Sequence, residues 1–210
     1  MPHNVYCTSL EKTTIPKSVK KIGVSAFGGC SKLKEVVLYN GLISIGETAF
    51  GDCVDLKNIR IPASVDSIGE HAFDAYNYSN RIFTPLANLT LECYRNSAAV
   101  SYALANSLNF KVIDATKNIR FPTLSSGMFN TTYHQFRLSW TPVDGAQQYG
   151  IAVKLAGKWK LHACTDAKTT NFTSPKLSQN SKYDMVICAK INGKWDTSAL
   201  TGRSFTVIVK

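Results

Sequence analysis

The chain has 210 residues, of which 44% are hydrophobic and 18% are charged, a composition typical of a folded globular protein rather than a disordered one. No run of about 18 apolar residues occurs, which excludes a transmembrane helix, and residues 1–10 lack the cationic start and apolar core of a secretory signal. The formal net charge is +10: residues 1–115 hold 11 Lys and Arg against 10 Asp and Glu, whereas residues 116–210 hold 13 against 4.

The N-terminal part repeats one motif three times. The segments IGVSAF, IGETAF and IGEHAF place their glycines and phenylalanines at a constant interval of 23 residues. A fixed period in the twenties predicts a solenoid, because one coil cannot bury its apolar side without stacking on its neighbours. We therefore expect the phenylalanines of the three motifs, Phe27, Phe50 and Phe73, to form one interior file.

The cysteines follow the same period. Cys7, Cys30 and Cys53 are each 23 residues apart, which predicts one buried column of free thiols rather than a disulfide framework. The sequence has no C-x-x-C pair, so we expect no metal centre and no redox centre. His162 and Cys164 could share one strand face, but a zinc site there would lack a fourth ligand, and we expect neither a metal nor a nucleophile.

Each coil is predicted to contain two short strands. Alternation in residues 33–38 and 56–61 directs Val36 and Ile59 inward, and a second strand is expected at the isoleucine of each IG motif. Stacked coils bring residues 23 apart to a distance of about 4.8 Å in a ladder. His71 replaces Ser25 and Thr48 in the third motif, which indicates a variable, outward position.

The outward side of the first strand in each coil is the candidate ligand-contact face. Its predicted members, at successive intervals of 23, are Lys12, Thr14, Glu35, Val37, Asn58, Arg60, Arg81 and Phe83. Exposed apolar side chains beside arginines have the composition of a protein interface. Paired carboxylates such as Asp52 and Asp55 occur at positions that vary between coils, so we expect them only to face water.

The pattern L-x-x-I-x-I-P followed by V-x-x-I-G-x-x-A-F, at residues 56–73, resembles the BspA-type leucine-rich repeat of bacterial surface proteins. The resemblance extends over about residues 7–85. In the third coil Tyr76 and Ser79 replace the expected Cys and Leu, which indicates that the array is ending. The sequence opens in the middle of a coil, so we expect further coils before it.

Residues 86–115 are expected to close the solenoid. The segment LANLTLECY predicts a last strand, and residues 97–108 predict a helix with Ser97 as its N-cap and an apolar stripe on one side. A strand over residues 110–113 follows. This order is similar to the C-terminal cap of the repeat family, so the helix is expected to cover the last coil.

Residues 116–210 change to short alternating strands separated by turns, about seven in all, which predicts a β-sandwich. In FRLSW the side chains of Phe136, Leu138 and Trp140 share one face. The inward positions of the next strand are predicted to be Tyr149, Ile151, Val153 and Leu155. The W-x-x-V-x-G-A-x-x-Y spacing from residue 140 to 149 is similar to a fibronectin type III domain.

The predicted fold is therefore mainly β: a leucine-rich-repeat solenoid with a cap (residues 1–115) and a fibronectin type III-like sandwich (residues 116–210). The resemblance implies a non-catalytic, cell-surface or secreted module that binds a protein or glycan through the strand face, without a cofactor. The alternatives are an accessory, targeting or spacer region of a larger surface enzyme, and polyanion binding by the basic sandwich. We expect no specific nucleic-acid partner, and self-association could occur through the exposed N-terminal coil.

Overall fold

A computed structural model describes the chain at residues 7–113 and 121–210. The chain divides into two compact units: Met1–Ala103 with Leu108–Phe110, and Leu104–Ser107 with Lys111–Lys210. The domain boundary predicted between residues 115 and 116 lies outside the described residues. The first unit contains the 23-residue repeats, and the second contains the alternating strands.

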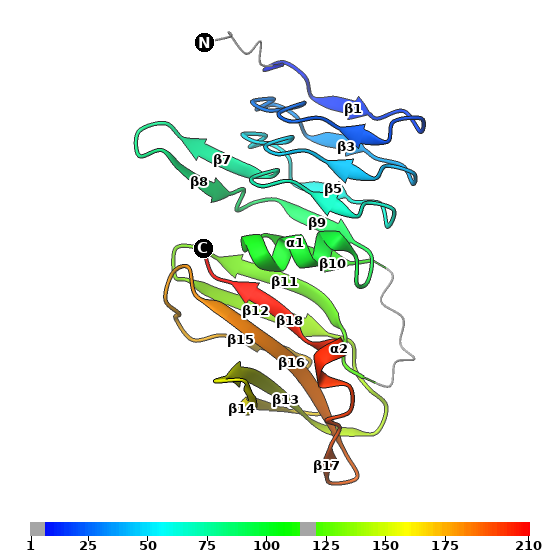
Figure 1. Cartoon of the computed structure of the whole chain (residues 1–210), viewed down its shortest axis with the longest axis vertical. Helices are drawn as coiled ribbons and strands as arrows, with labels where there is room; N and C mark the ends of the chain where they lie inside the picture. The colour runs from blue at the N-terminus through cyan, green and yellow to red at the C-terminus, as the bar shows by residue number, and fades with distance from the viewer. Residues whose placement is uncertain (1–6, 114–120) are drawn as a thin grey trace. The chain divides into compact units, whose positions relative to one another are not determined.

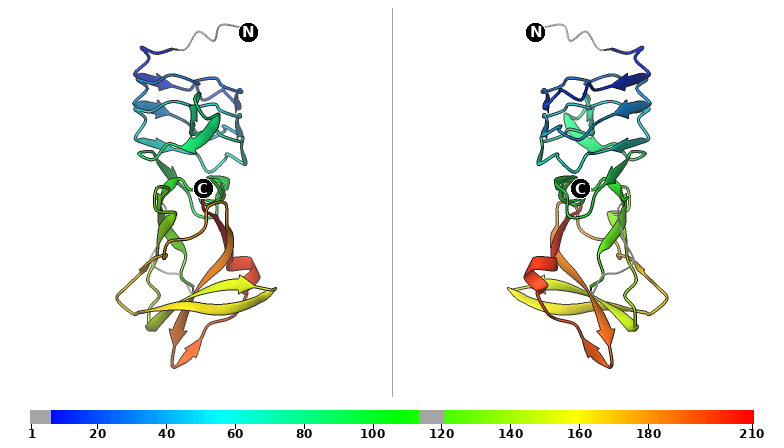
Figure 2. Two further views of the ribbon diagram at one scale, coloured as in Figure 1. Left: turned by 90° about the vertical axis from the view of Figure 1, so that its left-hand side faces the viewer. Right: turned by 90° about the vertical axis from the view of Figure 1, so that its right-hand side faces the viewer.

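The first unit is a solenoid with two parallel ladders (Figures 1 and 2). In one, β1 (Lys12–Thr14) pairs with β3 (Glu35–Val37), and β5 (Asn58–Arg60) occupies the same place in the next coil. The other contains β2 (Lys21–Ile22), β4 (Ser44–Ile45) and β6 (Ser67–Ile68), paired in that order. Lys12 lies opposite Glu35, and Ile45 lies opposite Ile68, so the partners are 23 residues apart as predicted. The repeat therefore corresponds to one coil of backbone.

The predicted phenylalanine file is confirmed. The ring of Phe50 stacks on that of Phe27 at a centroid distance of 5.2 Å and on that of Phe73 at 5.4 Å, with interplanar angles of 4° and 3°. Phe50 and Phe73 are fully buried, whereas Phe27, in the outermost motif, is half-buried. Val36 and Ile59 point inward as expected. The stacked rings and these aliphatic side chains form the core of the solenoid.

The IG glycines allow successive coils to approach each other closely. A Cβ atom added to Gly46 would lie 2.7 Å from the backbone of Gly23, and one added to Gly69 would collide with the backbone of Glu47. At Gly23 the same atom would meet nothing within 4 Å. Close packing between coils therefore requires glycine at the second and third motifs, while the first has free space.

The ladder continues after residue 73 with a different spacing. Residues Asp74–Asn77 (β7) and Ile82–Pro85 (β8) form an antiparallel hairpin, and the next strand of the ladder is β9 (Thr90–Cys93), which pairs in parallel with β5. Asn58 lies opposite Thr90, a step of 32 residues rather than 23. The predicted placement of Arg81 and Phe83 in the ladder is therefore wrong, because the hairpin is inserted before the fourth rung.

A helix follows, as predicted. The helix α1 (Ala98–Asn106) precedes β10 (Asn109–Val112), and the ring of Tyr102 meets that of Phe73 edge-on at 6.0 Å, so the helix covers this end of the phenylalanine file. Among the described residues the buried hydroxyl of Ser97 accepts and donates no hydrogen bond, so the predicted side-chain N-cap is wrong. No helix in residues 7–113 and 121–210 is long and apolar enough to cross a membrane.

The second unit contains two antiparallel sheets, as a β-sandwich requires. One sheet has the order β15 (Asn171–Thr173), β12 (Gln135–Trp140), β11 (Leu124–Asn130). The other has the order β14 (Lys158–Asp166), β13 (Ala146–Leu155), β16 (Lys182–Ile191), β17 (Lys194–Trp195), with β18 (Phe205–Ile208) also on β16. The short helix α2 (Leu200–Arg203) precedes β18.

The core of the sandwich contains the predicted inward residues, with one exception. Trp140 packs edge-on against the fully buried Tyr149 at 5.6 Å, and the Tyr149 hydroxyl accepts a hydrogen bond of 2.9 Å from the amide of Val143. Ile151 and Val153 are buried as well. Leu155 was predicted to be buried but is 50% exposed, since it lies at the end of β13.

Candidate binding surface

The outward face of β1, β3 and β5, here called the strand face, contains six of the eight residues predicted for it. Lys12, Thr14, Glu35, Asn58 and Arg60 are exposed and Val37 is half-buried. Its fourth rung is formed by Thr90 and Glu92 on β9. The strand face is thus mainly polar, and Arg81 and Phe83, which were expected at its end, do not belong to it.

Neighbouring rungs of the strand face neutralise each other's charges. Lys12 Nζ lies 2.9 Å from Glu35 Oε2, and this hydrogen-bonded carboxylate raises the pKa of Lys12. Arg60 donates from both Nε and Nη2 to Glu92 Oε2, each at 2.9 Å. Exposed pairs of this kind contribute about 0–1 kcal/mol to stability. The charges on this face are therefore largely paired within the protein.

The hairpin β7–β8 forms a different surface, which we call the aromatic hairpin (residues 74–85). The Phe83 ring lies 4.8 Å from the Tyr76 ring, and Tyr76 meets Tyr78 edge-on at 4.9 Å. Tyr78 is 71% exposed and Ile82 is 52% exposed. Large apolar groups are thus gathered on a protruding element that the 23-residue repeat does not require.

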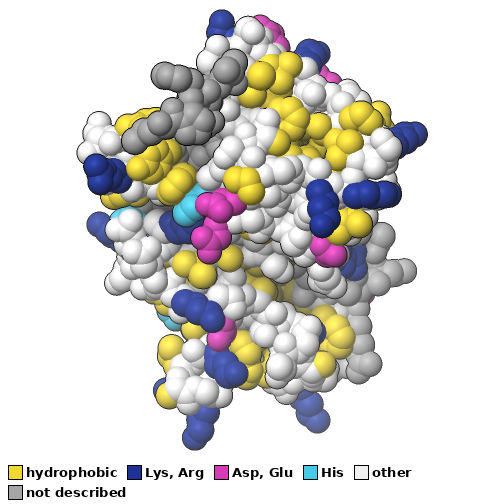
Figure 3. Space-filling model, turned by 45° about the horizontal axis from the view of Figure 1, so that its top comes forward, with side chains coloured by type: hydrophobic (Ala, Val, Ile, Leu, Met, Phe, Trp, Pro, Cys, Tyr) yellow, Lys and Arg dark blue, Asp and Glu magenta, His cyan; other side chains and the backbone are white. Residues whose placement is uncertain are grey.

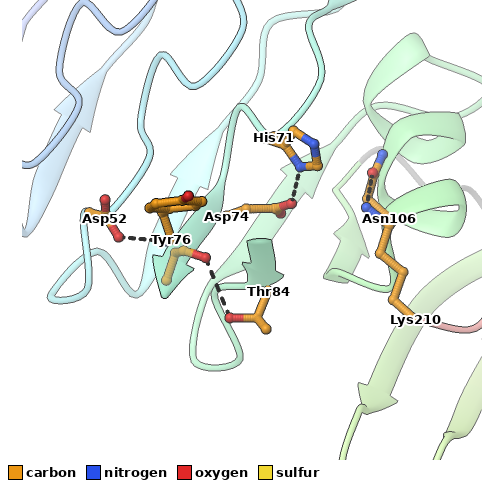
Figure 4. A network of polar contacts seen from close by, with 8 residues as sticks. Asp52, His71, Asp74, Tyr76, Thr84, Asn106 and Lys210 are labelled. Atoms are coloured by element: carbon orange, nitrogen blue, oxygen red, sulfur yellow. Dashed lines mark hydrogen bonds and ion pairs between the residues drawn. The ribbon is translucent and has the colours of Figure 1, made fainter. Parts of the chain in front are cut away.

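His71 supports the aromatic hairpin from the third coil. Its Nδ1 lies 2.7 Å from Oδ2 of the buried Asp74 (Figure 4), and its ring stacks on Phe83 at a centroid distance of 3.9 Å. The backbone of His71 is left-handed (φ 54°), as at Ser25 and Thr48 in the other coils. His71 was predicted to be a variable outward residue, but it is half-buried and joins the coil to the hairpin.

Further hydrogen bonds fix the hairpin. Asp52 Oδ1 accepts a bond of 2.8 Å from the amide of Tyr76, and the hydroxyl of Thr84 donates to the carbonyl of Ala75 at 3.5 Å (Figure 4). The prediction that Asp52 only faces water was therefore wrong. At the tip, Asn77 Oδ1 accepts from the amide of Ser79 at 2.9 Å. The aromatic side chains are thus held by backbone that is anchored at both its base and its tip.

Sequence reasoning missed this surface although a signal was present. Residues 74–77 and 82–85 flank the segment Asn77-Tyr78-Ser79-Asn80, in which asparagines favour a turn. Tyr76 and Ser79, which replace the expected Cys and Leu, were interpreted as the end of the array. The 23-residue spacing was nevertheless extended past them to predict the positions of the next strand. An insertion between two coils also interrupts the repeat pattern, so the sequence did not distinguish it from the end of the array.

The column of thiols is only partly buried. Cys30 and Cys53 are buried as predicted, but Cys7 is exposed, because it lies in the first coil that the structure describes. Burial raises the pKa of Cys53 and of Cys93 to about 12, so neither thiol ionises near neutral pH. In residues 7–113 and 121–210, no three His, Cys, Asp or Glu residues are grouped as a metal site would require.

Charges of both signs are distributed over the surface. On the face that Figure 3 shows, Lys and Arg side chains occur singly or in small groups, separated by hydrophobic and acidic side chains. Binding of a polyanion usually depends on several neighbouring cations. On this face the cations do not form one continuous patch.

Comparison with known proteins gives a family for the first part of the chain. Residues 4–119 match the family described as BspA type leucine rich repeat region (6 copies). The comparison with curated proteins found no match.

Three solved structures are similar to part of the chain. A structure titled "Structure of FN3tt mut" is 24% identical over 38% of this chain and 77% of its own, with a TM-score of 0.30. "Crystal Structure of FN3tt" is 25% identical over 36% and 74%, with a TM-score of 0.29. A Fn3-like protein from Clostridium thermocellum is 24% identical over 38% and 83%, with a TM-score of 0.31.

Proposed function

Because the chain belongs to the BspA-type leucine-rich repeat family, we propose that it is a non-catalytic binding module of a bacterial surface or secreted protein, and that it recognises a partner protein through the aromatic hairpin. Repeats of this type are typical of bacterial surface proteins. The observation that carries the proposal is the insertion of residues 74–85 into an otherwise regular solenoid, with Tyr78 and Ile82 at its exposed side.

The composition of the hairpin favours a protein partner. Tyr and Arg are enriched among the residues that contribute most to protein interfaces, and Arg81 lies between Tyr78 and Ile82 in the sequence. The contacts of Phe83 with His71 and Tyr76 order the aromatic rings before binding. A surface that is already ordered loses less conformational entropy when it binds, which favours affinity.

The strand face remains a second candidate, as the sequence predicted. Its residues Lys12, Thr14, Glu35 and Asn58 are exposed on neighbouring strands and Val37 is half-buried among them. The pairing of Lys12 with Glu35 and of Arg60 with Glu92 makes it the weaker one, since a ligand would have to compete with these contacts. A glycan partner remains the alternative to a protein.

The test is photo-crosslinking followed by affinity measurement. p-Benzoylphenylalanine replaces Tyr78 in one variant and Asn58 in another, and each is irradiated with candidate surface proteins before and after enzymatic removal of their glycans. We expect a crosslink from position 78 that survives deglycosylation. Crosslinking only from position 58, or its loss on deglycosylation, would contradict the proposed surface or the proposed kind of partner.

A matched pair of double variants gives the affinities. Replacing Tyr78 and Ile82 by serine removes two exposed apolar groups from the hairpin, and replacing Val24 and Val54, which are 69% and 51% exposed, removes two from the regular coils. Interface anchors each contribute about 2 kcal/mol, so we expect roughly a hundredfold or greater loss of affinity from the hairpin variant. Affinity should be unchanged in the valine variant.

The two other functions predict different results. Polyanion binding by residues 116–210 would give retention on heparin that falls steeply with salt and is unaffected by the hairpin variant. An accessory role in a larger surface enzyme would appear as loss of activity on immobilised substrate when the hairpin is altered within the longer protein. In that case the partner protein would be the enzyme's substrate or its carrier.

A further inference from the structure

The sandwich contains an apolar cavity of about 340 Å³ that the core side chains leave open. Side chains of β12, β13, β14, β15 and β16 line it, so both sheets of the sandwich contribute. Phe136, Val153, Phe172 and Met185 provide apolar wall. This volume lies within the range of about 300–1,000 Å³ that is usual for small-molecule sites.

Strand geometry explains why the cavity is open. β15 contains only three residues, so this sheet covers the opposing β13 and β14 along a short length. The pairing of β13 with β14 shifts register between Ile151 and Ala152. Leu155 lines the cavity and is nevertheless 50% exposed, which places apolar surface at its mouth.

The polar groups of the cavity are basic or neutral. Lys160, His162 and Tyr183 line it, and none of the acidic residues that the structure describes does. Within the described parts of the chain the side chains of Lys160 and Tyr183 make no hydrogen bond or ion pair, and the His162 ring makes only an edge contact with Phe172 at 6.2 Å. The Ser174 hydroxyl makes its hydrogen bonds within the protein: it accepts one from the amide of Phe136 and donates one to the carbonyl of Pro175.

Lys160 belongs to the inner side of its strand. It lies opposite Val153 in the antiparallel pair, and residues opposite each other point to the same face of a sheet. Val153 is buried in the core. The flexible stem of Lys160 can therefore follow the apolar wall while its ammonium group stays at the exposed mouth.

We propose that this cavity binds a small apolar molecule that carries one anionic group, such as a medium-chain carboxylic acid. The apolar part occupies the space between the sheets, and the carboxylate accepts charge-assisted hydrogen bonds from Lys160 together with bonds from Tyr183 or His162. A cation without an acidic neighbour favours an anionic head over a neutral one. The site belongs to residues 136–185 and is independent of the binding surface proposed for the repeats.

The test compares decanoate with decanol, which have the same chain length and differ in charge. Titration calorimetry on the full chain is expected to give at least tenfold tighter binding of decanoate. In Lys160→Met, which keeps an unbranched apolar side chain, decanoate should bind about tenfold more weakly and decanol should bind unchanged. The matched control is Lys154→Met on β13, since Lys154 alternates with the inward Val153 and does not line the cavity, and it should bind both probes as the unaltered chain does.

A second measurement on the unaltered chain does not depend on any variant. Decanoate should shift the amide resonances of residues lining the cavity, on β14, β15 and β16, and leave those of β17 in place. An inward lysine on an edge strand can also act only to prevent pairing with other sheets. No binding at 1 mM decanoate, equal binding of decanol, or equal loss in Lys154→Met and Lys160→Met would overturn the proposal.

Discussion

The regular coils of residues 7–73 and the interrupted segment of residues 74–93 place strands in the same ladder by different means. Within the coils each strand follows its neighbour by 23 residues, whereas β9 follows β5 by 32. Ile59 and its partner Leu91 are both buried, so the inward position is kept across the interruption. The additional residues leave the coil as the aromatic hairpin.

This difference separates two tasks. In the regular coils the same positions of each repeat form the core: the phenylalanine rings lie in one file, and glycines occur where the backbones of neighbouring coils approach each other. The interrupted segment keeps the core and adds residues that the core does not use, among them Tyr78 and Ile82. We infer that stability is concentrated in the repeated positions and recognition in the inserted ones.

Phe50→Ala should be the most damaging change. Phe50 is fully buried between two stacked rings, and loss of a buried phenylalanine costs about 3–5 kcal/mol. Phe27→Ala should cost less, because Phe27 is half-buried and stacks on one ring. Urea unfolding followed by circular dichroism measures both. The three tryptophans lie at 140, 159 and 195, so tryptophan fluorescence reports the sandwich and should be unchanged. Equal losses for the two variants would contradict a continuous file.

Gly69→Ala should have the next largest effect. The added methyl group would collide with the backbone of Glu47, and overpacking of this kind costs about 1–3 kcal/mol. Gly23→Ala is the matched control, since it occupies the same place in the first motif and has free space; we expect a change below about 0.5 kcal/mol. A tolerated alanine at Gly69 would mean that the coils are further apart than described.

The buried thiols should make the solenoid sensitive to alkaline pH. Burial raises the pKa of Cys53 and Cys93 to about 12, while an unfolded cysteine ionises near pH 8.5. The unfolded chain therefore loses these protons first, and the free energy of unfolding should fall between about pH 8.5 and 12, by roughly 1 kcal/mol per thiol at pH 9.5.

The double variant Cys53→Ala, Cys93→Ala should remove this part of the pH dependence. As an independent check, iodoacetamide at pH 8 should label the exposed Cys7 and Cys164 of the native chain and leave Cys53 and Cys93 unmodified. Rapid labelling of Cys53 or Cys93 would show that these positions open easily.

Arg60→Met should have the smallest effect on stability. It removes the exposed pair that Arg60 forms with Glu92 across the interruption, which contributes about 0–1 kcal/mol. The difference in the free energy of unfolding between Arg60→Met and the unaltered chain should decrease further in 1 M salt, because salt screens exposed ion pairs. A loss well above this range would mean that Arg60 holds β5 and β9 together.

The regular part of the fold could be predicted from sequence because each position was observed three times. The inward direction of Ile59, the file of phenylalanines and the ladder spacing all follow from repetition. The helix before β10 followed from its apolar stripe. In the sandwich, alternation identified Tyr149, Ile151 and Val153 correctly, and failed at Leu155, where the strand ends at the mouth of the cavity.

The aromatic hairpin could not be predicted in the same way. An insertion has no second copy with which to compare it, so the spacing of the coils was continued to Arg81 and Phe83. The roles of Asp52 and His71 depend on the hairpin, since each bonds or stacks with residues that the insertion brings to it. Contacts between a repeated and an inserted segment require the fold itself.

The most direct test of the interrupted ladder is disulfide formation from outward positions. Asn58 and Thr90 are partners in neighbouring parallel strands, at a separation of about 4.8 Å that a disulfide can span. In a chain whose exposed cysteines are replaced, Asn58→Cys with Thr90→Cys should form a disulfide under mild oxidation, and Asn58→Cys with Arg81→Cys should not. Crosslinking of the second pair instead of the first would show that the ladder keeps its 23-residue step and that the hairpin is not an insertion.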